Sequence, residues 1–325
     1  MIVFALKRLA QSIAVLFIMS ALVFAAVYAI GNPIDILINP QADQAEIAAA
    51  TKALGLDQPL WVQYKNFIVG AFAGDLGKSF AANIPAVRLI FDHMPATMEL
   101  ALTATLIAVF LGIPLGLVAG LKPESWIGRT IMAGSVVGFS LPTFWVGLML
   151  IMVFSVWLGW LPPTGRGHTV SVLGIPVSFL TWDGLAHLAM PALNLALFKL
   201  SLLVRLTRAG TREALAQDYV RFARAKGLSM RRVVRVHILK NIMIPIVTVT
   251  GLEFGSLIAF AVVTESIFAW PGMGKLLIDS INVLDRPVIV AYLLVVVLIF
   301  VLINLVVDLA YTALDPRVRL TGHSS

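Results

Sequence analysis

Four long runs of the sequence carry no Asp, Glu, Lys, Arg or His, and they constrain the fold more than any other feature. The runs cover residues 9–30, 100–121, 130–161 and 288–307. A bilayer is crossed by about 20 apolar residues in one stretch, whereas a helix on a soluble core keeps a polar face. Only 13% of the 325 residues are charged, against roughly a quarter in soluble domains. The sequence therefore predicts an all-α polytopic membrane protein.

The first run follows Lys7 and Arg8, an arrangement that also suits a secretory signal peptide. Residues 27–29 resemble a cleavage site. The uncharged run of residues 9–30 is, however, longer than the roughly 7–15 apolar residues of a signal. Further spans also follow it. We therefore expect a retained helix.

Two further apolar segments complete six predicted spans. Residues 184–204 carry His187 and Lys199, and residues 242–268 carry Glu253 and Glu265. Six spans place both termini on the same side of the membrane. Lys and Arg side chains are enriched on the cytoplasmic side. With both termini inside, sixteen of these residues lie inside and seven outside, so we predict cytoplasmic termini.

The third run is too long for one straight crossing. Pro142 lies near its middle and is expected to kink or break the helix. Irregular backbone at membrane depth survives only inside protein or beside a water-filled cavity. Pro142 is therefore a translocation-path candidate, with a simple packing kink as the alternative.

Two other segments predict helix packing. Gly112, Gly116 and Gly120 recur every four residues, and such small residues let two membrane helices approach closely. In the outer segment, residues 60–72 have apolar residues at helical spacing. We expect these residues to form an external helix lying against the membrane bundle.

Several classes of active site are disfavoured. The chain has no cysteine, and its five histidines show no zinc-binding spacing. Residues 77–79 read Gly-Lys-Ser, but a phosphate-binding loop would need glycine where Phe72 stands. We predict no catalytic residue, metal or cofactor on this chain. Energy for transport must then come from an ion gradient or from a separate protein.

The segment 205–241 carries ten Lys and Arg residues against two acidic ones. A basic loop touching anionic lipid is one interpretation, but it leaves the apolar residues unexplained. Leu215, Tyr219 and Phe222 are spaced as one face of a helix, with Ala223 beside them. Gly227 supplies a helix C-cap, and Ser229 can cap a second helix. We predict a docking site for a cytoplasmic protein.

Residues 218–228, with the sequence DYVRFARAKGL, resemble the EAA loop of binding-protein-dependent ABC importer permeases. Further matches are GDLG at 74–77, FAWPGMG at 268–274 and DPR at 315–317, and they are most similar to the dipeptide, oligopeptide and nickel branch. The glutamate that names the loop is Arg221 here. Any salt bridge made by that glutamate therefore does not carry over.

The resemblance implies a multi-pass protein of the bacterial inner membrane. It also implies a type I ABC importer transmembrane domain at residues 97–311, with the coupling loop at 205–241. An N-terminal membrane helix and external segment would precede it at 1–96, and a cytoplasmic tail would follow at 312–325. The implied partners are a second homologous permease, two cytoplasmic ABC ATPases that hold ATP and Mg²⁺, an external solute-binding protein and membrane lipid, but no nucleic acid. Leu215, Tyr219, Phe222, Ala223 and Gly227 would form the ATPase-docking site.

The implied cargo is a short peptide or a similar small solute, with glutathione-like compounds and nickel left open. Ionisable residues within spans are functional candidates, so Lys199, Glu253 and Glu265 join Pro142 as path candidates. Glu253 could meet a peptide's α-amino group, or it could pair with Lys199 or with the second permease. The alternative function is a secondary transporter or channel driven by an ion gradient.

Overall fold

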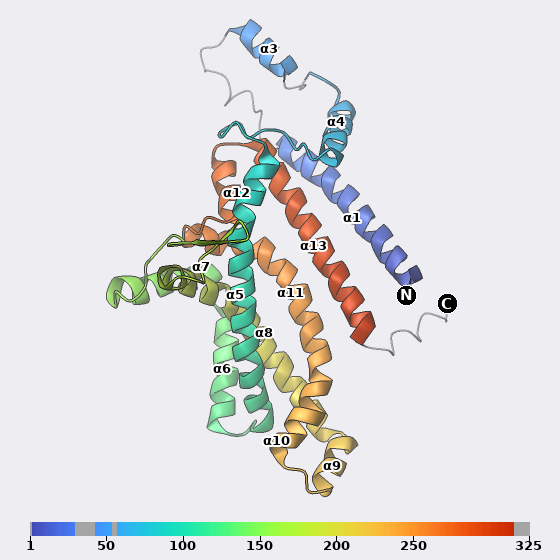
Figure 1. Ribbon diagram of the computed structural model, residues 1–325, viewed down its shortest axis with the longest axis vertical. Coiled ribbons are helices and arrows are strands. Elements are labelled where there is room, and N and C mark those ends of the chain that lie inside the picture. The colour runs from blue at the N-terminus through green and yellow to red at the C-terminus, as the bar shows by residue number, and fades with distance from the viewer. Residues whose placement is uncertain (1, 30–42, 54–56, 315–325) are drawn as a thin grey trace. The chain divides into compact units, whose positions relative to one another are not determined.

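The computed structural model describes residues 2–29, 43–53 and 57–314 (Figure 1). Within this part the chain forms two compact units. The larger unit holds residues 98–270 and 303 onward, and the smaller unit holds residues 2–97 and 271–302. The predicted motif at 315–317, and most of the predicted tail 312–325, lie outside the described residues.

The larger unit is built around long helices with one small hairpin. It takes in most of α5 (Ala86–Leu121), then α6 (Trp126–Ser140), α7 (Thr143–Leu150), the π-helical η1 (Ile151–Trp157), β1 (Val170–Val172), β2 (Ile175–Val177), α8 (Trp182–Ala216), α9 (Asp218–Ala225), α10 (Met230–Arg232), the π-helical η2 (Val233–Ile238) and α11 (Leu239–Ile267). The two strands pair antiparallel, with Val170 opposite Val177.

Helix α8 is the central helix of this unit, between α6 and α11 (Figure 1). In the apolar stretch of α8, 61% of the residues are buried, compared with 28% in the apolar stretch of the span that ends with α11. Thr181 caps its first turn, because the Thr181 side chain accepts a hydrogen bond from the Gly184 amide. At 1.5 Å per residue the helix is long enough to cross the hydrocarbon layer and continue beyond it.

The glycine row of α5 packs against α8, as predicted. A Cβ atom added at Gly116 would lie 2.5 Å from Thr207 Cβ and 2.7 Å from the Val204 carbonyl oxygen. Added at Gly112 or Gly120, it would meet α8 at 2.9 and 2.7 Å. The absence of side chains at these positions therefore sets how closely the two helices approach.

The predicted break at Pro142 is confirmed. Helix α6 ends at Ser140, Pro142 occupies the N-cap of α7, and the two helices are bent by 106°. Because proline lacks an amide hydrogen and its ring crowds the preceding turn, it is favoured at the start of α7 and disfavoured inside α6. In the described residues, five helices are long and apolar enough to span a membrane, and the bent pair brings the number to six if it counts as one broken span.

The smaller unit contains α1 (Ile2–Ala29), α3 (Gln44–Ala53), α4 (Leu60–Phe72), α12 (Met273–Asn282) and most of α13 (Arg286–Leu314). The predicted helix at residues 60–72 is confirmed as α4. It packs along α1, where the Tyr64 hydroxyl lies 2.9 Å from Ser20 Oγ and the Phe24 ring lies 5.3 Å from the Tyr64 ring. Its predicted outer location stays a prediction.

Asp285 fixes a loop of the smaller unit. Its carboxylate accepts hydrogen bonds from Ser79 Oγ at 2.5 Å and from the amides of Phe80 and Ala81 at 3.1 and 3.3 Å. Asp285 is buried in the turn that precedes α13. The Gly-Lys-Ser sequence at 77–79 therefore belongs to a loop that binds a carboxylate of its own chain. A negatively charged carboxylate at this place would repel a phosphate.

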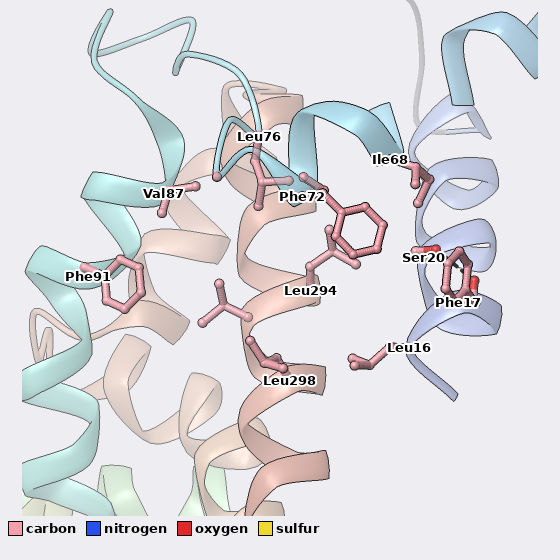
Figure 2. A pocket seen from close by; sticks show the side chains of 13 residues that line it. Leu16, Phe17, Ser20, Ile68, Phe72, Leu76, Val87, Phe91, Leu294 and Leu298 are labelled. Carbon is pink, nitrogen blue, oxygen red and sulfur yellow. Dashed lines mark hydrogen bonds between the residues drawn. The ribbon is translucent and has the colours of Figure 1, made fainter. Parts of the chain in front are cut away.

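Side chains of α1, α4, α13 and the start of α5 converge on a pocket of about 360 Å³ (Figure 2). Its thirteen lining residues include one with a polar side chain, Ser20, whose hydroxyl already bonds the Phe17 carbonyl oxygen at 2.8 Å. A charged solute would lose its hydration there without compensation. We therefore look elsewhere for a site that binds polar substrates.

Candidate functional site: an exposed aromatic face and an intramembrane ion pair

Helix α9 presents two aromatic side chains to solvent. Tyr219 is 39% exposed and Phe222 is 63% exposed. The adjacent face of α9 is buried, because Val220 and Ala223 pack into an apolar cluster with Val233, Ile238 and Ile242. Tyr219 and Phe222 are called the coupling surface below. In the larger unit, α9 and α10 lie together at one end (Figure 1).

Gly227 ends α9 with the predicted cap. Its φ angle is +79°, in the left-handed region that favours glycine. The Gly227 amide donates to the Arg224 carbonyl at 2.9 Å, and the Leu228 amide donates to the Ala223 carbonyl at 3.2 Å. These two hydrogen bonds are the pattern of a Schellman motif, which fixes the direction of the chain after the helix.

Two details of the predicted docking face were wrong. Leu215 and Phe222 do not share one helix, because α8 ends at Ala216 and α9 begins at Asp218. Gln217 is extended at the junction, with ψ of 148°. Leu215 is half-buried against the apolar cluster, and Ala223 lies inside it. Both therefore support α9 from within, and Tyr219 and Phe222 are the exposed members of the predicted apolar face.

The second predicted helix does start at Met230, with Ser229 at its N-cap position. The Ser229 carbonyl accepts the amides of Arg232 and Val233, at 2.9 and 3.0 Å, but its side chain makes no cap hydrogen bond. The helix is not short. It continues through the π-helical η2 into α11, so that residues 230–267 form one candidate span. Movement of α9 can therefore pass directly into a membrane helix.

Lys199 and Glu253 form an ion pair between α8 and α11. Lys199 Nζ also donates to Ser256 Oγ at 2.9 Å. The Lys199 side chain is 11% exposed and that of Glu253 is 33% exposed. Of the partners left open for Glu253, the structure thus provides Lys199.

The other two path candidates differ in environment. Glu265 is fully buried at the end of α11. It therefore does not open onto a solvent-filled path in this conformation. Pro142 stands at the bend between α6 and α7, flanked by Leu141 at 36% and Phe144 at 53% exposure.

Sequence reasoning missed a buried carboxylate centre at Glu99. Arg166 donates to Glu99 Oε2 through Nε at 3.1 Å and Nη2 at 2.6 Å. The other oxygen, Oε1, accepts from Ser178 N, Ser178 Oγ and Phe179 N at 2.6, 2.7 and 3.0 Å. Arg166 also lies over the Trp270 ring, 5.7 Å from its centroid. The available signal was the position of Glu99 directly before the uncharged run 100–121.

No group of three or more His, Cys, Asp or Glu residues that could hold a metal ion occurs in the part of the chain that the structure describes. The candidate site consists of the exposed coupling surface on α9 and the Lys199–Glu253 ion pair between α8 and α11.

Two family matches cover nearly the whole chain. The N-terminal family of binding-protein-dependent transport system membrane components matches residues 1–101. The family described as binding-protein-dependent transport system inner membrane component matches residues 112–320.

Relatives that match along nearly their whole length are also permease proteins of transport systems. The dipeptide transport system permease protein DppB of Alkalihalophilus pseudofirmus is 38% identical over 98% of this chain and 100% of its own. DppB of Escherichia coli K12 is 39% identical, covering 98% of this chain and 99% of its own. The glutathione transport system permease protein GsiC of Escherichia coli O6:H1 is 40% identical, with 98% and 99% coverage.

A solved structure shares the fold. A chain of the inward-facing MetNI methionine ABC transporter superposes with a TM-score of 0.53 at 15% identity, covering 70% of this chain and 96% of that one.

Proposed function

We propose that this chain, which belongs to the family of binding-protein-dependent transport system inner membrane components, imports short peptides. It is a multi-pass inner-membrane permease subunit of an ABC importer and is not itself catalytic. The observation that supports a peptide cargo is the end-to-end similarity to dipeptide and glutathione permeases at 38–40% identity. Di- and tripeptides, glutathione included, share an α-ammonium and an α-carboxylate group on a short backbone.

Family membership implies an ATPase and a solute-binding protein as partners. We propose that the full complex has one further, homologous permease and two ATPase subunits, which hold ATP and Mg²⁺. We also propose cytoplasmic termini, because sixteen Lys and Arg residues then lie inside and seven outside. Residues 1–96, 97–311 and 312–325 remain the proposed domains. One family match ends at residue 101 and the other begins at residue 112, and this division near residue 97 supports the first boundary.

The coupling surface is the proposed contact for the ATPase. Tyr219 and Phe222 are exposed on a segment rich in Lys and Arg, where two large rings cost free energy in water. A ring buried in a protein contact removes about 150–250 Å² from water, and binding energy concentrates in such anchors. Because α9 packs against η2, and η2 runs into α11, closure of the ATPases would move α11.

The path for the peptide is proposed to pass Pro142, Lys199 and Glu253. The bend of 106° at Pro142 and the intramembrane ion pair support it, because irregular backbone and charge at membrane depth are tolerated beside a path. Glu265, fully buried, is not retained for direct contact in this conformation.

Gradient-driven transport or a channel is the alternative function, and family membership argues against it. Reconstitution decides between the two. The complex of this permease with its partners, in liposomes, should accumulate a labelled dipeptide only with ATP inside and binding protein outside. Accumulation driven by a proton or sodium gradient without ATP would overturn the proposed function.

A further inference from the structure

The ion pair between Lys199 and Glu253 removes charge from water. Both residues lie within predicted apolar spans, and the Lys199 side chain is only 11% exposed. Removing two charges from water often costs more than their attraction returns, and apolar residues of similar size stabilise a protein as well or better. The pair is therefore a poor stabilising device, and charged residues within spans mark substrate or ion pathways.

Two threonine side chains lie beside the pair, and one of them is without a hydrogen-bond partner among the described residues. Thr105 from α5 and Thr250 from α11 line the same small cavity as Lys199 and Glu253. Thr250 Oγ1 is buried and has no hydrogen-bond partner among the described residues. The cavity holds only about 10 Å³, roughly the space for one water molecule. In this conformation Lys199 and Glu253 bind each other, and the cavity beside them is too small for a peptide.

An exposed strip continues from the pair across α8 to α6. Lys199 Nζ lies 5.3 Å from the centroid of the Phe198 ring. Phe198 stacks on Phe139 at 4.7 Å, and the Arg205 guanidinium lies 4.2 Å from the Phe139 centroid. The two rings are 37% and 41% exposed. The strip therefore offers aromatic surface for a side chain beside one carboxylate and two cations.

We propose that the Lys199–Glu253 pair is a recognition point for the charged ends of the peptide. It opens by exchange: the Glu253 carboxylate releases Lys199 and takes the peptide's α-ammonium group, while Lys199, still bonded to Ser256, takes the α-carboxylate. The exchange replaces one ion pair by two and leaves no charge unpaired in the membrane. This inference rests on the proposed function, since it assigns a contact to the proposed peptide cargo.

ATP-driven uptake by reconstituted complexes tests the exchange with three forms of one dipeptide: free, N-acetylated and C-amidated. For each compound, uptake by a variant is divided by uptake by the wild type, and this ratio is called the quotient. Differences in how well the binding protein delivers each compound cancel in the quotient. Glu253→Gln should lower the quotient about tenfold for the free peptide, the effect of losing one charge-assisted hydrogen bond. For the N-acetylated peptide it should stay near one. Lys199→Met should show the same contrast between the free and the amidated peptide.

Two further variants guard against a merely structural effect. Glu265→Gln makes the same chemical change on the same helix, at a fully buried carboxyl group, and should leave the free and acetylated quotients equal. The double variant Lys199→Met with Glu253→Leu leaves no unpaired charge. It should insert normally. Its quotient should fall further for the free peptide, which loses two contacts, than for the acetylated or the amidated peptide, each of which loses one.

The outcomes separate the two proposals. If the wild-type complex imports no peptide with ATP, the proposed function fails. If the wild type imports peptide but Glu253→Gln lowers free and acetylated peptide alike, or the double variant keeps wild-type uptake of free peptide, only the recognition point is overturned.

Discussion

The Glu99 carboxylate accepts two hydrogen bonds from the Arg166 guanidinium across 67 residues of sequence. The side chains are 2% and 10% exposed, so water does not screen the pair. Through Ser178 and Phe179 the same carboxylate holds the chain that follows the β hairpin. One carboxyl group thus fixes the connection between η1 and α8 to helix α5.

Replacing Glu99 by Gln should therefore destabilise the permease strongly. Removing one partner of a buried ion pair costs about 3–5 kcal/mol, which corresponds to a fall in melting temperature of at least about 5 °C for a chain of this size. Thermal unfolding of the purified variant in nanodiscs measures this fall in melting temperature. Arg129→Ala, which breaks an ion pair whose side chains are 71% and 86% exposed, is the control and should leave the melting temperature unchanged.

Gly116→Leu should separate α5 from α8. A side chain there meets the α8 backbone at 2.7 Å, so one helix must move, and overpacking of this kind costs about 1–3 kcal/mol. Gly134→Leu on α6 is the matched control, because a Cβ atom at Gly134 meets nothing within 4 Å. Equal melting temperatures for the two variants would contradict close packing along the glycine row.

Gly227→Val should impair the coupling of ATP hydrolysis to peptide uptake without loosening the packing of the transmembrane helices. Nothing lies within 4 Å of a Cβ atom at this position, so the change acts through the φ angle of +79°. A β-branched residue resists that angle, whereas Asn tolerates it. Gly227→Asn should therefore keep most of the ATP-driven uptake and Gly227→Val should lose it, with both variants inserted to the same level. Equal uptake by the two would exclude a role for the left-handed cap.

The proposed orientation is testable because the native chain contains no cysteine. Leu173, 99% exposed at the tip of the β hairpin, is a suitable outer position. A membrane-impermeant maleimide added to spheroplasts should label Leu173→Cys and leave Ser229→Cys unlabelled until the membrane is opened. The reverse pattern would place the termini outside.

The uncharged runs and the helix-ending residues of the sequence predicted much of this fold. The uncharged runs located four spans, Pro142 located the break, and Gly227 located the cap of α9, because each acts through a local property of the backbone. The same reasoning failed at Gln217. The apolar spacing of Leu215, Tyr219 and Phe222 is helical, but the chain turns at Gln217 and directs Leu215 into the cluster formed with Ile242 and Ile246.

Long-range polar contacts were beyond sequence reasoning. Glu99 and Arg166, or Ser79 and Asp285, become partners only once the helices pack, and nothing near them in the sequence signals the pairing. Lys199 and Glu253 were candidates because each is a charge within an apolar span. Their pairing depends on the register between α8 and α11, which no single-helix pattern determines.

The most direct test of this account is coupled transport by the Tyr219→Ala, Phe222→Ala double variant. Both side chains are exposed, so the variant should insert and unfold like the wild type. Truncating anchors of a protein interface typically costs at least about 2 kcal/mol each, which weakens binding of the ATPases more than tenfold. In liposomes containing the partner proteins, we predict that substrate-stimulated ATP hydrolysis and peptide uptake fall together by at least that factor. Wild-type uptake and hydrolysis in the double variant would contradict the account.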